Sequence, residues 1–448
     1  MIDKSYQNDQ NVTKFHLTIV RYKLYDDFCS DGFNVEISDR NNHVIFRKSV
    51  TSEFHSENCE CPRENTFEKL QCFSSLSNQR LLFKIQSDLK PFEGEHKIDF
   101  ENVLKTVEEE FGVHERTYAL CLYQIINGKL YKKCFGEYVG FSKFFDGFLL
   151  SILRKFSLSN TEFIVNLGDW PLALKKKFNL KLPIFSWCGS KDTFDIVLPT
   201  YEITESVLHS QGRITTDILS VFGKQPLPFD KKTNKLFWRG RDSHRSRLNL
   251  ISIAAQSPLS TFYNVSITNF FFFRDEMKNY LSPEEIGNKH VPFTEFFKYK
   301  FQLNIDGSVA AYRFPFLLAG NSLVLKQDSD YYEFFYEILI SNQHFIPVNH
   351  ELKNLDSILK HILTNFKSYE KLIWNSRKFV LEHLLPENIY CYYVNALNLY
   401  SSLLKQSNIQ IRKGCEQINS IDSENFSFVD ISGCNCSQFS RHTFKSEL

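Results

Sequence analysis

The pattern of apolar and polar residues predicts an α/β protein. Short apolar runs bounded by turn residues are typical of strands, and apolar positions three and four residues apart are typical of helices. Strands are predicted at 16–22, 33–37, 44–46, 162–167, 184–188, 195–199, 235–238, 268–273, 301–305, 323–325 and 345–348. Helices are predicted at 80–89, 100–111, 139–156, 245–255, 293–299, 308–318, 331–338, 355–366, 369–385 and 388–404. Because both kinds of element are mixed along most of the chain, we expect α/β layers.

The stretch 298–326 predicts a strand, a tight turn, a helix and a second strand. Gly307 supplies the turn, and Ser308 suits the N-cap of the helix that follows. A helix of this length allows a parallel crossover. The free N–H groups at Ser308, with Arg313 about one turn further in, suggest a site for the diphosphate of a nucleotide-sugar. Most such turns bind nothing, and taken alone the stretch favours that alternative.

Residues 120–135 predict a hairpin, because Asn127-Gly128 is a strong two-residue turn signal. Counting back from the turn places Cys121 opposite Cys134. Hydrogen-bonded and non-hydrogen-bonded pairs alternate along an antiparallel ladder, and Ile126 with Lys129 at the turn is a hydrogen-bonded pair. Cys121 with Cys134 is therefore a non-hydrogen-bonded pair, with Cα atoms about 4.5 Å apart. That spacing lies in the range of a disulfide, so we predict one here.

Two groups of polar residues follow predicted strands, at the edge where open α/β sheets bind ligands. Asp169, beside Trp170, could act as a general base on a hydroxyl, or it could simply accept backbone N–H groups in a turn. Arg239, Gly240 and Arg241 suit a diphosphate, or form a solvated basic turn. From the residues alone, the turn is favoured for Asp169 and the two readings of the arginines are equal.

The sequence offers little for a metal. Asp328 and Asp330 could hold a divalent cation, but Asp330 equally suits the N-cap of the predicted helix 331–338, and we prefer that interpretation. Cys59 and Cys61 lack a second pair at zinc-binding spacing, so disulfides are the better prediction for them.

Charge and composition narrow the class of protein. The chain of 448 residues has 53 basic and 52 acidic residues, a net charge of +1, so nothing suggests nucleic acid as a partner. The sequence contains no run of 18 apolar residues, and we expect no membrane span. The cores should be rich in aromatic rings, because 44 residues are phenylalanine.

Several features point to the secretory lumen. The chain has eleven cysteines and N-glycosylation sequons at Asn11, Asn264, Asn425 and Asn435. The terminal Lys445-Ser446-Glu447-Leu448 is similar to the Lys-Asp-Glu-Leu address of the endoplasmic reticulum. Residues 1–11 lack the pattern of a signal peptide. We therefore expect that the natural start is missing, the alternative being that the terminal match is accidental.

Four blocks in order resemble a known family. They are Val165-Asn166-Leu167-Gly168-Asp169-Trp170-Pro171-Leu172, Ile184-Phe185-Ser186-Trp187-Cys188-Gly189-Ser190, Trp238-Arg239-Gly240-Arg241-Asp242-Ser243, and Asn304-Ile305-Asp306-Gly307 with Val309-Ala310-Ala311-Tyr312-Arg313. The chain is similar to the protein O-glucosyltransferases of the capsule-associated-protein family, above all to the KDEL motif-containing members. The resemblance runs from about residue 16 to the end, and it outweighs the alternatives given for each motif alone.

The resemblance implies an inverting enzyme of the GT-B type, with two Rossmann-like lobes facing a cleft. It would transfer glucose from UDP-glucose to serines of EGF-like repeats in secreted or membrane proteins, without a metal. A KDEL-type retrieval receptor would be a further partner. Alternatives are UDP-xylose or another acceptor, or a non-enzymatic lumenal binding protein.

The resemblance also implies roles for particular residues. Asp169 matches the catalytic base, and Trp170 beside it is an acceptor-side candidate. Ser190 and the turn of Arg239, Gly240 and Arg241 match donor-site positions. The nucleotide-diphosphate loop matches Ser308, Val309, Ala310, Ala311, Tyr312 and Arg313.

The same resemblance suggests disulfides from Cys59 to Cys391 and from Cys61 to Cys72. The pattern of elements, with a proline-containing polar linker at 223–234, divides the chain. We predict a partial filamin-like β segment at 1–55, a lobe carrying the base at 56–222, a nucleotide-sugar lobe at 223–385, and a terminal helix and tail at 386–448.

Overall fold

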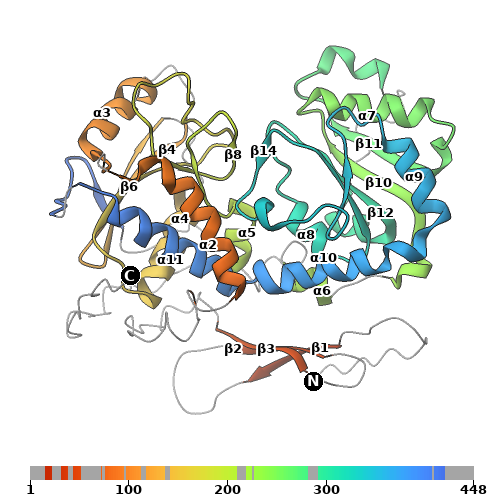
Figure 1. Ribbon diagram of the computed structural model, residues 1–448, viewed down its shortest axis with the longest axis horizontal. Coiled ribbons are helices and arrows are strands. Elements are labelled where there is room, and N and C mark those ends of the chain that lie inside the picture. The colour runs from red at the N-terminus through yellow and green to blue at the C-terminus, as the bar shows by residue number, and fades with distance from the viewer. Residues whose placement is uncertain are drawn as a thin grey trace.

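Most of the chain folds around two β-sheets that lie side by side (Figure 1). The computed structural model describes residues 16–22, 32–38, 44–51, 72, 76–94, 97–112, 118–136, 142–208, 218–223, 227–280, 291–405 and 408–418. The fold is mixed α/β, as the sequence predicts.

The first sheet contains six strands in the order β16-β5-β4-β6-β7-β9. Its strands are β4 (Leu120–Ile126), β5 (Lys129–Phe135), β6 (Thr161–Asn166), β7 (Ile184–Ser186), β9 (Ile196–Val197) and β16 (Glu416–Ile418). Around it lie α2 (Leu76–Leu89), α3 (Phe100–Phe111), α4 (Ser142–Lys155), α5 (Tyr201–Leu208) and α11 (Pro386–Ser402). Helix α11 packs on α2, α5 and β6, so the chain returns near its end to the first sheet.

The second sheet is entirely parallel, in the order β11-β10-β12-β13-β15. Its strands are β10 (Thr233–Arg241), β11 (Tyr263–Asn269), β12 (Tyr299–Asn304), β13 (Leu323–Gln327) and β15 (Ile346–Val348). Its helices are α6 (Ile218–Gly223), α7 (Arg245–Gln256), α8 (Phe314–Ala319), α9 (Leu355–Thr364) and α10 (Glu370–His383). Strand β11 lies on one side of β10 and β12 on the other. The connections therefore diverge between β10 and β12, which is the switch point where doubly wound sheets bind ligands.

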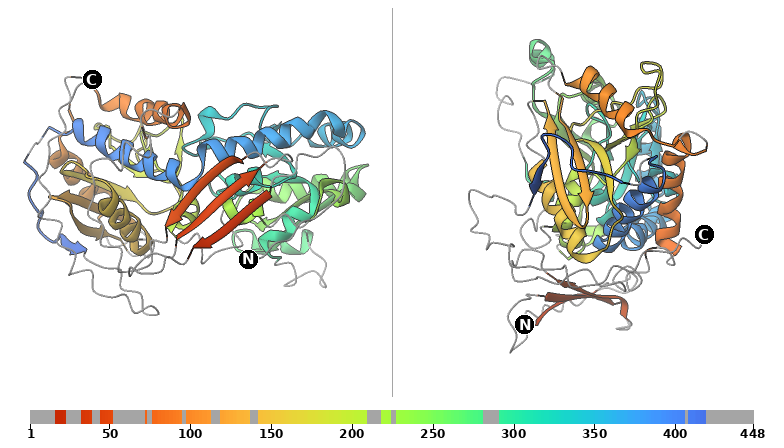
Figure 2. Two further views of the ribbon diagram at one scale, coloured as in Figure 1. Left: turned by 90° about the horizontal axis from the view of Figure 1, so that it is seen from below. Right: turned by 90° about the vertical axis from the view of Figure 1, so that its left-hand side faces the viewer.

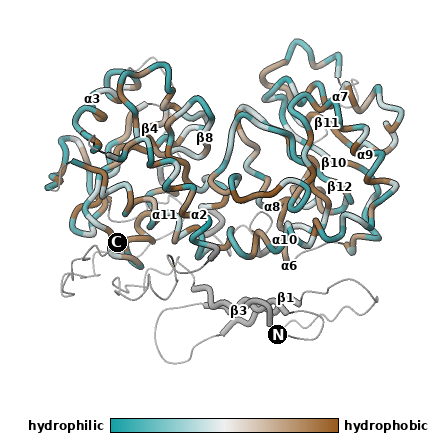
Figure 3. Tube along the Cα trace, viewed as in Figure 1, coloured by the Kyte–Doolittle hydropathy of each residue, from teal (hydrophilic) through white to brown (hydrophobic). Residues whose placement is uncertain are grey.

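Short 3-10 helices connect these elements. They are η1 (Lys90–Phe92), η2 (Phe229–Lys231), η3 (Ser260–Phe262), η4 (Arg274–Asn279), η6 (Phe293–Lys298), η7 (Tyr336–Ile338) and η8 (Phe366–Tyr369). Hydrophobic residues concentrate in the interior strands and in α8, as Figure 3 shows. Within the described residues, no helix is long and apolar enough to cross a membrane.

A two-stranded ladder joins the two halves. Strand β8 (Gly189–Ser190) pairs with β14 (Tyr331–Tyr332). The predicted helix 331–338, with Asp330 as its N-cap, is therefore wrong. A Cβ at Gly189 would lie 2.6 Å from the Tyr332 ring, so the glycine lets the two strands approach. Asp330 instead forms an exposed ion pair with Lys191 at 3.7 Å.

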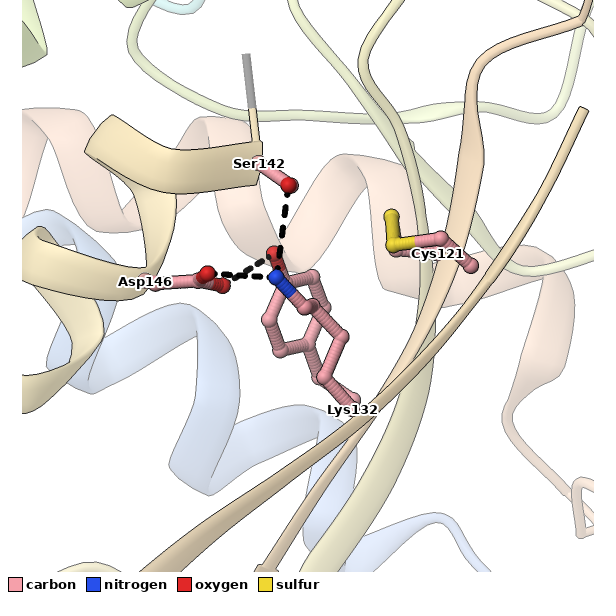
Figure 4. The surroundings of a disulfide bond; sticks show 6 residues. Cys121, Lys132, Ser142 and Asp146 are labelled. Carbon is pink, nitrogen blue, oxygen red and sulfur yellow. Dashed lines mark hydrogen bonds and ion pairs between the residues drawn. A yellow bond between two sulfur atoms is a disulfide. The ribbon is translucent and has the colours of Figure 1, made fainter. Parts of the chain in front are cut away.

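The hairpin of β4 and β5 has the predicted register. Ile126 faces Lys129, and Cys121 faces Cys134 and is bonded to it, with the Cα atoms 4.0 Å apart. Next to this disulfide, the Lys132 ammonium group contacts the Asp146 carboxylate and lies 3.3 Å from the Ser142 hydroxyl (Figure 4). The Lys132 side chain of β5 thus anchors the hairpin to α4.

The second disulfide joins Cys72 to Cys391, with Cα atoms 5.0 Å apart. The pairings of Cys59 with Cys391 and of Cys61 with Cys72 are therefore wrong. Helix α11 packs along α2 and brings Cys391 to Cys72. The backbone carbonyl of Cys72 also accepts a hydrogen bond from the Asn395 side chain at 3.4 Å. Cys59 and Cys61 themselves lie outside the described residues.

Three antiparallel strands near the N-terminus form a sheet of their own (Figure 2). They are β1 (His16–Tyr22), β2 (Gly32–Ser38) and β3 (Val44–Thr51). The filamin-like assignment of this segment stays a prediction. Asn11, Asn425, Asn435 and the terminal tetrapeptide lie outside the described residues.

Two further segments of the second half differ from the prediction at positions near the cavity. The strand expected at 268–273 ends at Asn269, because the buried Asp242 carboxylate accepts the backbone N–H groups of Phe271 at 2.8 Å and Phe273 at 2.6 Å. These bonds draw the chain away from the sheet. The helix expected at 308–318 begins only at Phe314, and residues 305–313 form a loop.

Candidate active site

A cavity of about 770 Å³ lies at the switch point of the second sheet. That volume is within the range of ligand pockets, about 300–1,000 Å³. Its walls come from the end of β10, the loop 305–313, the start of α5, and the turn after β6. The predicted residues among them are Asp169, Arg239, Gly240, Arg241 and the whole run from Ser308 to Arg313. The tertiary structure therefore brings the predicted base and the predicted donor loop to one site.

The loop 305–313 is shaped by its own backbone and by Arg247. The N–H of Gly307 donates to the carbonyl of Val309 at 2.9 Å, which closes a tight turn. A Cβ at Gly307 would lie 2.9 Å from the Arg247 guanidinium, so any other residue would require this side chain to shift. Pro315 suits the first turn of α8 because it lacks an N–H group. Because α8 begins at Phe314, Ser308 is not at a helix N-terminus. The loop would therefore have to bind an anion without the free N–H groups of a helix start.

Arg247 ties together the two strand ends at the switch point. It is 5% exposed, and it donates to the carbonyls of Asp306 at 2.6 Å, Arg241 at 2.9 Å and Ile305 at 3.3 Å. Burial, followed by the positive charge of Arg313, lowers its pKa to about 9. Sequence reasoning did not assign Arg247 to the site.

Arg313 adds a second cation to the same wall. Its guanidinium donates to the Arg239 carbonyl at 2.6 Å and lies over the Phe296 ring at 5.4 Å. Loss of hydration lowers the pKa of Arg313, and an approaching anion would offset that loss. The positive charges of Arg247 and Arg313 therefore make this part of the cavity suited to a diphosphate.

Arg239 and Arg241 differ in what their side chains contact. The Arg239 guanidinium donates to the Asn264 carbonyl at 2.8 Å and to its side-chain oxygen at 2.7 Å, and it stacks over Phe237. Arg241 is exposed, and within the described residues no hydrogen bond or ion pair engages its side chain. Arg241 is thus the better placed of the two to reach a ligand.

Asp169 lies in a turn that Asn166 organises at the end of β6. The Asn166 amide donates to the Trp170 carbonyl at 2.6 Å and to the Ser186 hydroxyl at 3.1 Å, and its oxygen accepts the Gly168 N–H at 3.0 Å. The preceding sheet and this asparagine therefore determine where Asp169 stands.

The backbone and the carboxylate of Asp169 have different surroundings. Its carbonyl accepts the Cys188 thiol at 3.3 Å and the Tyr312 hydroxyl at 3.4 Å. Tyr312 belongs to the loop 305–313, so this bond links the predicted donor loop to the predicted base. Within the described part of the chain, no group pairs with the Asp169 carboxylate. That side chain is exposed to the cavity, yet the surrounding protein reduces its hydration and raises its pKa.

Two predicted residues lie outside the cavity wall. Ser190 pairs with Tyr331 in the ladder between the halves, and its hydroxyl accepts the Asp192 N–H at 3.3 Å. Trp170 is 51% exposed and follows the base directly. Two lining residues that sequence reasoning missed, Tyr201 and Glu202, begin α5. No local sequence signal distinguished them.

The described residues contain no group of three His, Cys, Asp or Glu side chains that could hold a metal. Asp328 accepts the N–H of Ser329, and Asp330 is paired with Lys191, so both contact protein groups. The expectation that the reaction needs no metal stays a prediction.

A cavity lined by arginines at the switch point of a parallel sheet, with the unpaired Asp169 carboxylate in its wall, is suited to an enzyme that acts on a phosphate-bearing substrate. The chain belongs to glycosyl transferase family 90, whose sequence pattern matches residues 79–425. It is therefore an enzyme, and the names of its relatives place it among the protein O-glycosyltransferases.

The relatives are similar over most of their length. The chain is 38% identical to protein O-glucosyltransferase 2 of Danio rerio over 406 residues, which cover 89% of this chain and 77% of that protein. It is 36% identical to protein O-glucosyltransferase 3 of Homo sapiens, over 89% of this chain and 76% of that protein. The chain is 27% identical to protein O-glucosyltransferase 1 of Bos taurus, over 75% of this chain and 82% of that protein.

Proposed function

We propose that this enzyme transfers glucose from UDP-glucose to a serine hydroxyl of an EGF-like repeat, with inversion at the anomeric carbon. The observation that carries the proposal is the cavity that holds the unpaired Asp169 carboxylate together with Arg247, Arg313 and the loop 305–313. The relatives' names, which specify glucose and a protein acceptor, support the donor and the acceptor class.

In the proposed mechanism, Asp169 takes the proton from the serine hydroxyl as its oxygen attacks the anomeric carbon. The bond from that carbon to the diphosphate breaks on the opposite face, and UDP leaves with the electron pair. The guanidinium groups of Arg247 and Arg313 stabilise the charge that develops on the diphosphate. This assigns charge stabilisation to arginines rather than to a metal. Chelation with EDTA should therefore leave the rate unchanged.

The domain architecture and the cellular location of the enzyme are part of the same proposal. The two sheets with their helices would be the lobes of a GT-B enzyme, and 1–55 a partial filamin-like segment. The enzyme would act in the lumen of the endoplasmic reticulum, where a KDEL-type receptor would retrieve it through residues 445–448.

A transfer assay tests this function. The purified chain is incubated with a folded EGF-like domain that carries one acceptor serine, and with UDP-glucose or UDP-xylose in parallel. We expect UDP release and a mass increase of one hexose on the domain with UDP-glucose. Faster transfer from UDP-xylose would overturn the donor assignment, and the absence of transfer from either would overturn the acceptor.

A further inference from the structure

Two neighbouring phenylalanines at the cavity are exposed to solvent. Phe271 is 59% exposed and Phe272 is 53% exposed, and their ring centroids are 5.2 Å apart. Phe272 also lines the cavity that holds Asp169. We call this pair the aromatic rim. Adjacent exposed aromatic rings beside a ligand site are a feature of interaction surfaces.

The aromatic rim is held in place by a buried carboxylate. Asp242 is fully buried, and its two oxygens accept the N–H groups of Phe271 and Phe273. Phe270 is buried and Phe273 lies beneath the Arg245 guanidinium at 4.4 Å. The outer residues of this Phe270–Phe273 run are thus anchored, and its two central rings remain exposed. Because both carboxylate oxygens are bonded to the backbone of this segment, the shape of the loop depends on Asp242.

The acceptor must cover this surface if the proposed function holds. A protein hydroxyl reaches the Asp169 carboxylate only when the acceptor protein sits over the cavity. It then meets exposed aromatic rings, namely Trp170, which directly follows the base, and Phe272, which lines the cavity. The proposed function assigns the diphosphate of the donor to Arg247, Arg313 and the loop 305–313, which line the same cavity without the rim.

We infer that the aromatic rim, Phe271 and Phe272, binds the acceptor protein at an apolar side chain that lies near its acceptor hydroxyl. The inference rests on the proposed function and extends it, because it assigns a part of the surface to acceptor recognition. Residues that bind the acceptor away from the reacting atoms should change its KM with little effect on kcat.

The test replaces each ring in the full chain, as Phe271→Ala and Phe272→Ala. We expect the KM for the EGF-like domain to rise about tenfold or more, since aromatic residues central to an interface often contribute at least about 2 kcal/mol. The affinity for UDP and kcat at saturating acceptor should stay within about twofold. Phe83→Ala is the matched control: Phe83 is 68% exposed on α2, outside the cavity wall, and its loss should leave all three quantities unchanged.

Each other outcome contradicts the inference in a different way. An unchanged acceptor KM in both variants would overturn it while the proposed function stands. A parallel loss of UDP affinity would show that the rim binds the donor, and a change in oligomeric state without a change in KM would show that it contacts a second copy. A wild-type chain that binds UDP but transfers no sugar to the domain would overturn the proposed acceptor and, with it, the partner assigned to the rim.

Discussion

Asp169 combines a fixed backbone with an unpaired carboxylate. Its carbonyl accepts hydrogen bonds from Cys188 and Tyr312, while no described group pairs with its side chain. A structural aspartate in a turn would use its carboxylate to accept backbone N–H groups, as Asp195 does for Leu172 and Ala173. The contrast between these two carboxylates supports the assignment of Asp169 as the base.

We predict that Asp169→Asn abolishes sugar transfer and leaves the affinity for UDP nearly unchanged. The amide keeps the size of the side chain but cannot accept the serine proton. Transfer is measured by mass spectrometry and UDP affinity by calorimetry, with Asp192→Asn, at an exposed neighbouring loop, as the control. Full activity of Asp169→Asn would refute the assignment of the base.

The raised pKa of Asp169 also predicts how the rate depends on pH. Reduced hydration raises this pKa above its usual value, and the base acts only when it is deprotonated. The rate should therefore fall as the pH decreases through the raised pKa, at a higher pH than an ordinary aspartate would give. A profile of kcat/KM against pH, with a parallel record of the folded fraction, measures this. An acid limb at or below the ordinary pKa of aspartate would contradict it.

Arg313 should act on the donor rather than on the proton transfer. Arg313→Ala is expected to raise the apparent KM for the UDP-sugar about tenfold or more, because a hydrogen bond to a charged group contributes about 1.5–3 kcal/mol. Arg313→Lys keeps the charge but loses the planar fork, so its effect should be intermediate. Initial rates at varied donor concentration measure both variants. An unchanged donor KM in Arg313→Ala would remove this residue from the donor site.

At the scale of elements, the two disulfides close loops of very different length. Cys72 and Cys391 are 319 residues apart, and Cys121 and Cys134 are 13 residues apart. In the chain-entropy account, the longer loop stabilises the fold by up to about 3 kcal/mol more. Replacing the first pair by serine should therefore lower Tm clearly more than replacing the second. Thermal unfolding of both double variants measures this, and equal losses would contradict the entropic account.

The predictions of elements succeeded where the signal was local. The hairpin register follows from Asn127-Gly128 alone, and the pairing of Cys121 with Cys134 follows from that register. The strand that ends at Asn269 and the loop before Phe314 could not be predicted, because Asp242 and Arg247 shape them through contacts with distant parts of the chain. Such contacts override local propensity.

At the scale of the whole molecule, the two halves share contacts besides the β8–β14 ladder. A continuous hydrophobic core contains Phe185 of the first sheet together with Phe237 and Val324 of the second. In addition, the buried Lys84 on α2 contacts Asp88, lies over the Tyr332 ring at 4.5 Å and lies 3.4 Å from Glu337. A buried lysine thus connects α2 of the first half to β14 and η7 of the second.

We predict that Lys84→Met strongly destabilises the fold. Removing one partner of a buried ion pair typically costs about 3–5 kcal/mol, because the other charge stays buried. In the wild-type protein, burial raises the pKa of Asp88 and the charge of Lys84 offsets part of that rise. Without Lys84, the pKa of Asp88 should therefore be higher than in the wild-type protein. A carboxyl with a raised pKa in the folded state destabilises that state at high pH and ceases to do so as the pH falls through that pKa. The loss of Tm should therefore shrink as the pH decreases.

The control for this prediction is Lys105→Met. Lys105 also pairs with an acidic residue four positions later, Glu109, but both side chains are more than half exposed. Exposed pairs contribute little, so Tm should change slightly at every pH. A Tm deficit of Lys84→Met that stayed constant from neutral to acidic pH would contradict the role given to Asp88.

Local patterns were sufficient to predict the α/β class, the parallel unit of β12, α8 and β13, the hairpin with its disulfide, and the residues at strand ends, because periodicity, turn chemistry and motif order are local. Long-range packing was needed to establish the strand order β11-β10-β12-β13-β15 of the second sheet, the bond from Cys72 to Cys391, and the shape of the loop before Phe314. These depend on which distant surfaces pack together. That packing makes Asp169 and the arginines walls of one cavity, although about 140 residues separate Asp169 from Arg313 along the chain.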